Sequence, residues 1–237
     1  MPKEILIAKN ITREGPGLIE EVLQEESLPY RIVDLSQGQA ITAQDSFDIL
    51  VVMGGPDSAN DKTQKMQAEI QSVEEAIKSG KPFLGVCLGL QVMVKAMGGE
   101  VVKGSAPEIG FRSQSGGFNA INLTIDGKND PLFTGLGSTF RVFHLHGETV
   151  NLTPQMKLLG TGRDVDNQIV RVGTKAYGIQ CHFELTGEML ETWLAQDDDL
   201  KAQDQGQIRS DFAANRAKYT QVGKKLVRNF LEIAQAA

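Results

Sequence analysis

The chain has 237 residues, of which 41% are hydrophobic and 23% are charged, and its formal net charge is −6. This balance is ordinary for a globular protein, and the negative charge argues against a nucleic-acid partner, which requires a basic surface. The sequence has no run of about 18 apolar residues, so we expect no membrane-spanning helix. The N-terminal residues lack the apolar core of a secretory signal. The two cysteines, Cys87 and Cys181, form no CxxC pair, so we expect a reducing cytoplasm and no disulfide framework.

The first hundred residues alternate between short apolar runs and amphipathic segments. Strands are predicted at residues 5–8, 30–35, 48–53 and 83–86, and helices at residues 18–26, 63–79 and 88–97. Alternation at this spacing implies right-handed crossovers and therefore an α/β fold, with a mostly parallel sheet flanked by helices. In such sheets ligands bind at the carboxyl ends of the strands, where this chain has Gly54-Gly55 and Cys87.

The second half of the chain is richer in glycine and polar turns. Short strands are predicted at residues 118–125, 139–144, 157–160, 168–172 and 176–183, and we expect them to form a small antiparallel extension of the same sheet. Helices are predicted at residues 186–195 and 207–236, separated by the acidic run 197–199, which we interpret as a solvated loop.

The composition predicts one domain over residues 1–237, because no linker-like stretch divides the chain. Its core is expected at residues 1–195, followed by a C-terminal helical extension at residues 196–237. We interpret the charged terminal helix as a surface helix or as a contact between copies of the chain in a homo-oligomer.

Cys87 lies in the pattern Gly85-Val86-Cys87-Leu88-Gly89, where a predicted strand meets a predicted helix. A nucleophile at such a junction sits in a strained turn above the sheet, and the flanking glycines leave room for it. The start of the following helix directs N–H groups and a positive dipole end to the same place, which stabilises a thiolate and a developing oxyanion. The alternative is a buried structural cysteine, which is a common role of a free thiol.

A cysteine nucleophile needs a base, and the base needs a group that orients it. His182 and Glu184 are two residues apart on a predicted extended segment, so their side chains point to the same face. The carboxylate can then accept from one imidazole nitrogen while the other nitrogen faces the thiol. Taken alone, the pair is also consistent with a structural core histidine and a solvated glutamate at a helix start.

Three segments together resemble the class I (triad) glutamine amidotransferase family: MGGPDSAND, PFLGVCLGLQVM and YGIQCHFEL. Their order and spacing also match the family, and the resemblance covers roughly residues 1–195. The family's flavodoxin-like fold agrees with the strand and helix pattern. Among its members, the chain is similar to the glutaminase domain of guanylate synthase.

The resemblance implies a role for each residue that matches a family motif. Cys87 attacks the side-chain amide of glutamine, His182 transfers the proton and Glu184 orients His182, with a thioester as the intermediate. The N–H groups of Gly55 and Leu88 hold the oxyanion. Further residues implied in substrate binding are Gly54, Gln91, Leu145, His146 and Gly147. No cofactor is implied. In the family the ammonia passes to an acceptor, and since nothing in this sequence resembles a nucleotide-binding synthetase, either a separate synthase subunit receives it or the enzyme only hydrolyses a γ-glutamyl bond.

Several residues depart from the family pattern or compete with this interpretation. Phe183 replaces a common proline between His182 and Glu184, which leaves open how firmly Glu184 is held. Cys181 replaces a common phenylalanine, and its expected nearness to Cys87 is an oxidation liability. His144 and His146 form an H-x-H pair, but the sequence offers only Glu148 nearby as a third ligand, so we expect no metal. The segment 103–117 is expected to border the substrate pocket and to limit the size of the leaving group.

The sequence is also consistent with two other functions. The same chemistry with a larger leaving group would make the protein a γ-glutamyl peptidase or hydrolase. A protein of a different class, a non-enzymatic chaperone or redox sensor, would use Cys87 as an oxidisable thiol and would not need His182 or Glu184.

Overall fold

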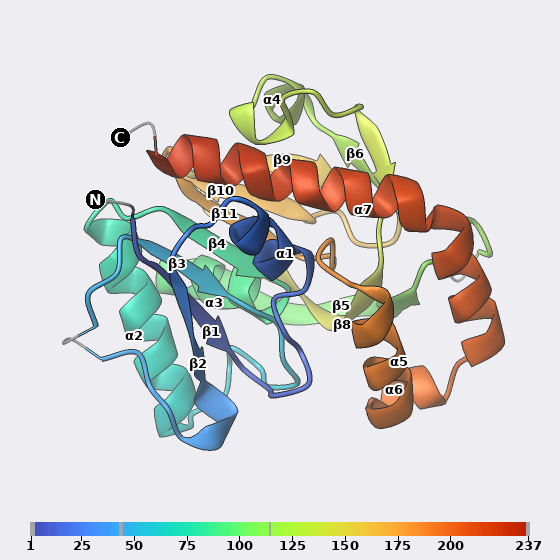
Figure 1. Cartoon of the computed structure of the whole chain (residues 1–237), viewed down its shortest axis with the longest axis horizontal. Coiled ribbons are helices and arrows are strands. Elements are labelled where there is room, and N and C mark those ends of the chain that lie inside the picture. The colour runs from blue at the N-terminus through green and yellow to red at the C-terminus, as the bar shows by residue number, and fades with distance from the viewer. Residues whose placement is uncertain (1–2, 43–44, 114, 236–237) are drawn as a thin grey trace.

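A nine-stranded sheet runs through the protein (Figure 1). The computed structural model describes residues 3–42, 45–113 and 115–235. The strand order is β2 (Tyr30–Asp34), β1 (Ile5–Lys9), β3 (Ile49–Val52), β4 (Phe83–Val86), β11 (Ala176–Ile179), β10 (Ile169–Val172), β9 (Met156–Thr161), β6 (Ala120–Leu123) and β7 (Thr139–Arg141). Strands β2 to β11 pair in parallel, and the pairs from β11 to β7 are antiparallel, so the predicted α/β fold and its antiparallel extension are confirmed.

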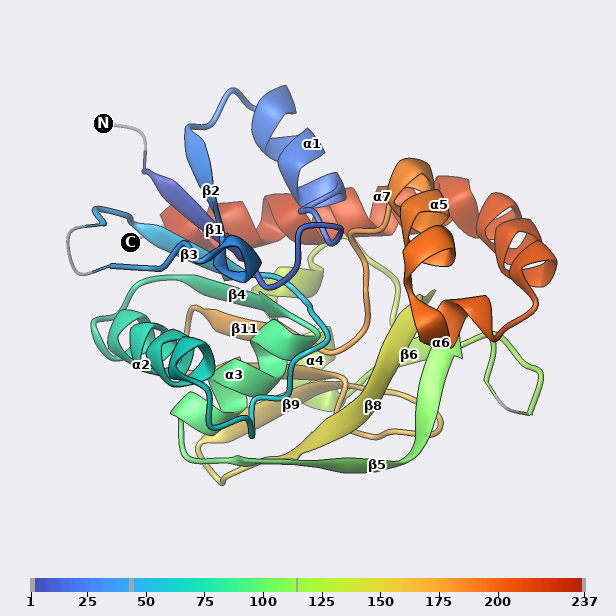
Figure 2. The same ribbon diagram turned by 90° about the horizontal axis from the view of Figure 1, so that it is seen from below.

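Helices cover both faces of the parallel part of the sheet. Helices α1 (Leu18–Glu25) and α7 (Gln205–Gln235) lie on one face, and α2 (Gln64–Lys78) and α3 (Leu88–Ala96) lie on the other (Figure 2). The strands supply apolar side chains to both layers because alternate residues point in opposite directions. In β1, Ile5 and Ile7 pack with the first layer, whereas Leu6 and Ala8 pack with the second.

A second sheet pairs β5 (Glu100–Gly110) with β8 (His144–Asn151) in antiparallel fashion. The sequence did not predict β5 as a strand, because it contains Gly104 and Pro107, which are uncommon inside strands. The register places Glu108 directly opposite His146. This pairing fixes one wall of the candidate active site.

The C-terminal helix is part of the core, which corrects our interpretation of it as a surface or subunit helix. Helix α7 buries Leu226 and Phe230 against the sheet, and its Tyr219 hydroxyl donates to the carbonyl of His182 at 2.8 Å. The predicted end of this helix at residue 236 lies outside the described residues. The shorter elements are α4 (Ile125–Lys128), α5 (Gly187–Gln196), α6 (Asp198–Lys201) and the 3₁₀ turns Leu35–Gln37 and Pro131–Phe133. Among the described helices, none is long and apolar enough to cross a membrane.

Candidate active site

Cys87 occupies a strained turn between β4 and α3. Its φ of 51° and ψ of −105° lie in a region that residues with a Cβ rarely adopt. The flanking glycines are required sterically. A Cβ on Gly85 would lie 2.4 Å from the backbone of Gly89, and a Cβ on Gly89 would lie 2.2 Å from the carbonyl oxygen of Val52. The sheet and the helix therefore approach each other too closely for a side chain at either glycine.

His182 and Glu184 lie just beyond the end of β11, and both are almost completely buried. Glu184 Oε1 accepts from His182 Nδ1 at 2.7 Å, and its Oε2 accepts from the backbone N–H of Phe183 at 2.9 Å. The backbone bond shows that phenylalanine in place of proline gives the carboxylate an additional donor. Burial lowers the pKa of His182, but attraction to Glu184 and to Cys87 outweighs it, so the pKa is raised well above its ordinary value.

A cavity of about 310 Å³ opens beside these residues. Of the residues predicted from the sequence, those that line it are Gly55, Cys87, Gln91, Leu145, His146, Gly147 and His182. Gly54, Leu88 and Glu184 are buried just behind this wall. The fold thus brings together side chains from β4, β8 and the segment after β11, which are far apart in the sequence.

Gly54 and Gly55 follow β3 and adjoin Cys87. A Cβ on Gly54 would lie 3.1 Å from the His182 ring and 3.5 Å from the Cys87 Cβ, and a Cβ on Gly55 would lie 2.5 Å from Asn10. In the described parts of the chain, no backbone carbonyl accepts from the N–H of Gly55 or Leu88 outside regular helix and strand ladders. Neither N–H group is therefore committed to a backbone bond of this kind.

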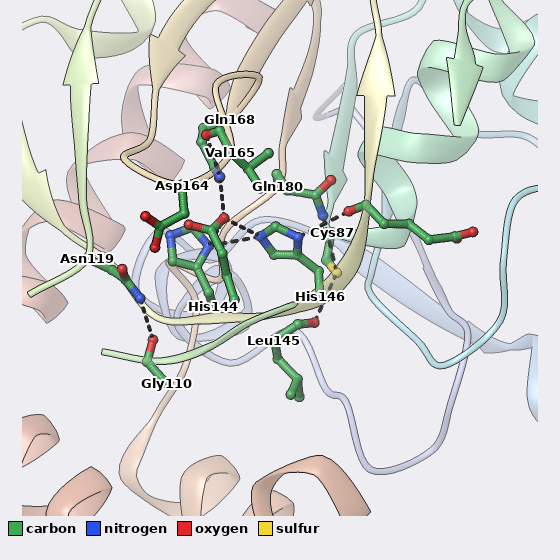
Figure 3. Close-up of polar contacts among 12 residues, drawn as sticks. Cys87, Gly110, Asn119, His144, Leu145, His146, Asp164, Val165, Gln168 and Gln180 are labelled. Atoms are coloured by element: carbon green, nitrogen blue, oxygen red, sulfur yellow. Dashed lines mark hydrogen bonds and ion pairs between the residues drawn. The ribbon is translucent and has the colours of Figure 1, made fainter. Parts of the chain in front are cut away.

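The Cys87 sulfur is held between β8 and the end of β11. Its Sγ lies 3.7 Å from the carbonyl oxygen of Leu145, and the Gln180 side-chain amide donates to the sulfur at 3.6 Å. Figure 3 shows the Cys87 sulfur between Leu145 and Gln180. The Gln91 amide donates to the carbonyl of Glu148 at 3.3 Å, which ties α3 to β8. Gln91 therefore reaches the cavity wall one helical turn after Cys87.

The charged residues of this cavity that sequence reasoning missed include Arg13, Glu14 and Asp197. Glu14 is 6% exposed and lies beside Gly54; burial raises the pKa of its carboxyl, although the charges of His182 and Arg13 oppose that shift. Arg13 pairs with Asp197 at 2.8 Å. No local pattern marks these residues, because only tertiary packing brings the β1–α1 loop to the start of α6.

Two expectations about the surroundings of the site need correction. The acidic run 197–199 is exposed at Asp198 and Asp199 as expected, but it is not a loop: the Asp197 side chain accepts from the N–H of Leu200 and begins α6, and Asp197 and Asp199 line the cavity. The segment 103–117, apart from Gln114, which lies outside the described residues, does not border the Cys87 cavity. Its residues 107–113 line a second cavity of about 290 Å³ instead.

Cys181 is fully buried, and burial raises the pKa of its thiol well above the ordinary value. A neutral thiol is a poor nucleophile and oxidises slowly. The oxidation liability that we expected from its nearness to Cys87 is therefore small.

Known proteins resemble this chain in sequence and in fold. The family model "Glutamine amidotransferase class-I" matches residues 17–198. The glutamine amidotransferase-like protein YfeJ of Salmonella typhimurium is 33% identical over 199 residues, which cover 81% of this chain and 80% of that protein. One subunit of the glutamine-hydrolysing GMP synthase of Sulfurisphaera tokodaii is 28% identical over 141 residues, 59% of this chain and 68% of the relative. The crystal structure of a glutamine amidotransferase from Thermotoga maritima superposes with a TM-score of 0.86 at 25% identity, covering 98% of this chain and 99% of that one. The chain therefore belongs to the class I glutamine amidotransferase family.

Proposed function

We propose that the protein hydrolyses the side-chain amide of glutamine to glutamate and ammonia, with Cys87 as the nucleophile. Relatives of the chain are named as glutamine-hydrolysing subunits. The observation that carries the proposal is the position of Cys87, which faces a cavity from a strained strand–helix turn beside the buried His182–Glu184 pair. Such an arrangement is typical of an activated nucleophile and its oriented base.

In the proposed first half-reaction, Cys87 Sγ attacks the amide carbon of glutamine while His182 Nε2 accepts the thiol proton. The carbonyl oxygen becomes an oxyanion, which accepts hydrogen bonds from the N–H groups of Gly55 and Leu88. Collapse of this intermediate breaks the C–N bond, and His182 donates its proton to the departing nitrogen. Ammonia leaves, and a γ-glutamyl thioester remains on Cys87.

In the second half-reaction, a water molecule attacks the thioester carbon and His182 accepts its proton. The oxyanion forms again in the same position, the C–S bond breaks and the proton returns to the sulfur, so that glutamate is released. Glu184 holds the imidazole in one tautomer throughout and stabilises the imidazolium, which agrees with the raised pKa of His182.

Substrate binding is assigned to the cavity wall beside the thiol. Gln91, Leu145, His146 and Gly147 line the cavity, and β8 offers backbone groups that suit the charged α-amino and α-carboxylate ends of glutamine. Gly54 keeps the end of β3 close to the thiol because any side chain there would meet Glu14 and His182.

The proposed fate of the ammonia is transfer to a separate synthase subunit. Two kinds of relative are themselves named as subunits, one of GMP synthase and the other, HisH, of imidazole glycerol phosphate synthase, the latter 31% identical over 130 residues. A partner of this type would dock where the cavity opens, at the rim that carries Arg13, Asp197 and Asp199.

The direct test is release of glutamate from free glutamine by purified protein, with and without candidate synthase subunits. We expect activity in the wild type and its loss in Cys87→Ala, and mass spectrometry should find a glutamine-analogue alkylator on Cys87 and not on Cys181. Intact activity in His182→Ala would contradict the proposal and favour a redox or chaperone role for the thiol.

A γ-glutamyl hydrolase is the second candidate, because the cavity extends from the thiol to a charged rim and leaves room for a leaving group larger than ammonia. Turnover of glutamine and of γ-glutamyl dipeptides should be compared at equal concentration. A strong preference for glutamine would reject this candidate.

A further inference from the structure

A second cluster of ionisable side chains lies against the cavity wall, between β5 and β8. It consists of Glu108, His144 and His146, which are 4%, 1% and 9% exposed. Glu108 is the cross-strand partner of His146, and His144 is two residues before His146, so all three side chains share one face of the small sheet. The sequence offered only Glu148 as a third ligand; the fold brings Glu108 there instead.

The donor atoms of this cluster have the spacing of a metal-binding site. His146 Nε2 lies 3.0 Å from Glu108 Oε2 and 3.1 Å from His144 Nδ1, and the third separation, His144 Nδ1 to Glu108 Oε2, is 3.8 Å. Donors bound to a tetrahedral zinc ion at about 2.0–2.1 Å lie roughly 3.3–3.4 Å from one another. The three separations average about 3.3 Å, so one ion can reach all three atoms at bonding distance.

The hydrogen bonds around the cluster indicate a positive charge between His146 Nε2 and the Glu108 carboxylate. His146 Nδ1 lies 3.1 Å from the carbonyl oxygen of Glu148, which can only accept, so this nitrogen carries the hydrogen. In a neutral ring, the lone pair of Nε2 then faces the Glu108 carboxylate at 3.0 Å. Two acceptors this close repel each other unless a cation lies between them.

The surrounding residues orient the donors as the outer shell of a metal site does. A ligating histidine commonly donates its second N–H to a backbone carbonyl, as His146 does here, and a ligating carboxylate is commonly hydrogen-bonded. The Gln168 side-chain amide donates to Glu108 Oε2 at 2.8 Å, and Glu108 Oε1 is buried without a hydrogen-bond partner among the described residues. Figure 3 shows His144, His146 and Gln168 converging on one point.

We propose that Glu108, His144 and His146 bind a divalent transition-metal ion, for which two imidazoles and one carboxylate best match zinc. The ion would join β5 to β8 behind Leu145 and Gly147, which line the Cys87 cavity. Its role would be to hold the substrate-facing strand in place. The proposal does not depend on the reaction that Cys87 performs.

The test measures metal binding in the Cys87→Ala protein, so that the thiol cannot hold the ion. Chelator-treated protein is titrated with Zn²⁺ and with Co²⁺, and metal content, Co²⁺ visible absorption and thermal stability are recorded. We expect about one ion per chain, a tetrahedral Co²⁺ spectrum and a melting temperature that rises with Zn²⁺. Failure of both ions to bind would overturn the proposal. The positive charge between Glu108 and His146 would then be a shared proton.

Matched variants locate the ion. Glu108→Gln should abolish binding, whereas Glu148→Gln should not, because only the backbone carbonyl of Glu148 contacts the cluster while its carboxylate accepts from Ser58. Gln168→Met, which removes one outer-shell bond and nearly conserves volume, should weaken the affinity roughly 10–100-fold. The assignment would be contradicted if Glu148→Gln lost as much metal affinity as Glu108→Gln. It would also be contradicted if Glu108→Gln and Gln168→Met both kept the wild-type metal affinity. Circular dichroism of each variant separates loss of the ion from loss of the fold.

Discussion

Glu69 on α2 should make the protein less stable as the pH rises through neutrality, and Glu69→Gln should remove this effect. The carboxyl is 3% exposed, and its Oε1 accepts from the Asn10 side-chain amide at 2.7 Å. Asn10 in turn packs where a side chain on Gly55 would have to lie. Burial raises the pKa of Glu69 to about 7, although the Asn10 hydrogen bond and the charge of Lys65 oppose the shift.

The sign follows from proton linkage. Between the unfolded pKa of 4.5 and the folded pKa of about 7, the native state binds more protons than the unfolded state, so the free energy of unfolding falls as the pH rises. At roughly 1.4 kcal/mol per pKa unit, the stabilisation lost over this window is about 3 kcal/mol. The neutral carboxyl also supplies a donor where Glu69 Oε2 and Asn10 Oδ1 are buried acceptors without partners among the described residues.

Urea unfolding followed by circular dichroism, at intervals between about pH 4 and pH 8, measures this difference. We expect Glu69→Gln to match the wild type near pH 4 and to be more stable near pH 8, by up to about 3 kcal/mol. The control is Glu75→Gln, an exposed position on the same helix, which should change stability by less than about 0.5 kcal/mol at every pH. If the free energy of unfolding of the wild type and of Glu69→Gln changed in parallel with pH across this range, the reasoning would be refuted.

Three further predictions concern the site itself. Burial lowers the pKa of His182, but the charge of Glu184 outweighs this effect and the net pKa is raised. The stability that the pair adds is therefore complete below the unfolded pKa of His182 and is lost as the pH rises through its folded pKa. Glu184→Gln should abolish this alkaline decline in the free energy of unfolding, measured with urea. Gly89→Ala should lower the free energy of unfolding by about 1–3 kcal/mol and slow alkylation of the thiol, because the new Cβ would meet the carbonyl of Val52; an unchanged alkylation rate would contradict this. Tyr219→Phe, which removes a buried hydroxyl from the carbonyl of His182, should cost about 1–3 kcal/mol, and a loss below about 0.5 kcal/mol would show that the bond adds little.

The sequence predicted the parallel part of the sheet and the nucleophile turn because both depend on local pattern. Strand β4 and the turn at Cys87 occupy the predicted residues, since a short apolar run and two glycines leave few other conformations. The pairing of His182 with Glu184 also followed from spacing alone. These features need no knowledge of distant segments, and the three motifs that contain them identified the family correctly.

The features that sequence reasoning missed depend on register and on tertiary packing. Glu108 meets His146 only because β5 pairs with β8 across a register shift, which no pattern in either strand determines. Glu14 reaches His182 only because the β1–α1 loop folds over the end of β3. Contacts between residues so far apart in the sequence can be identified only from the three-dimensional structure, because the local pattern does not determine their distance in space.

Helix α7 is a different case, because its sequence did contain the missing signal. Its buried residues Tyr219, Val222, Leu226 and Phe230 recur at helical spacing, which is typical of a helix that packs on a core, although the many charges around them suggested a surface helix. Gly223 lies among them, and an interior glycine costs a helix roughly 1 kcal/mol relative to alanine. A Cβ there would lie 2.3 Å from the carbonyl oxygen of Phe183, so the glycine lets the helix approach the segment that holds His182 and Glu184. A glycine within an apolar stripe is therefore a reason to expect close backbone contact, and here that contact supports the candidate site.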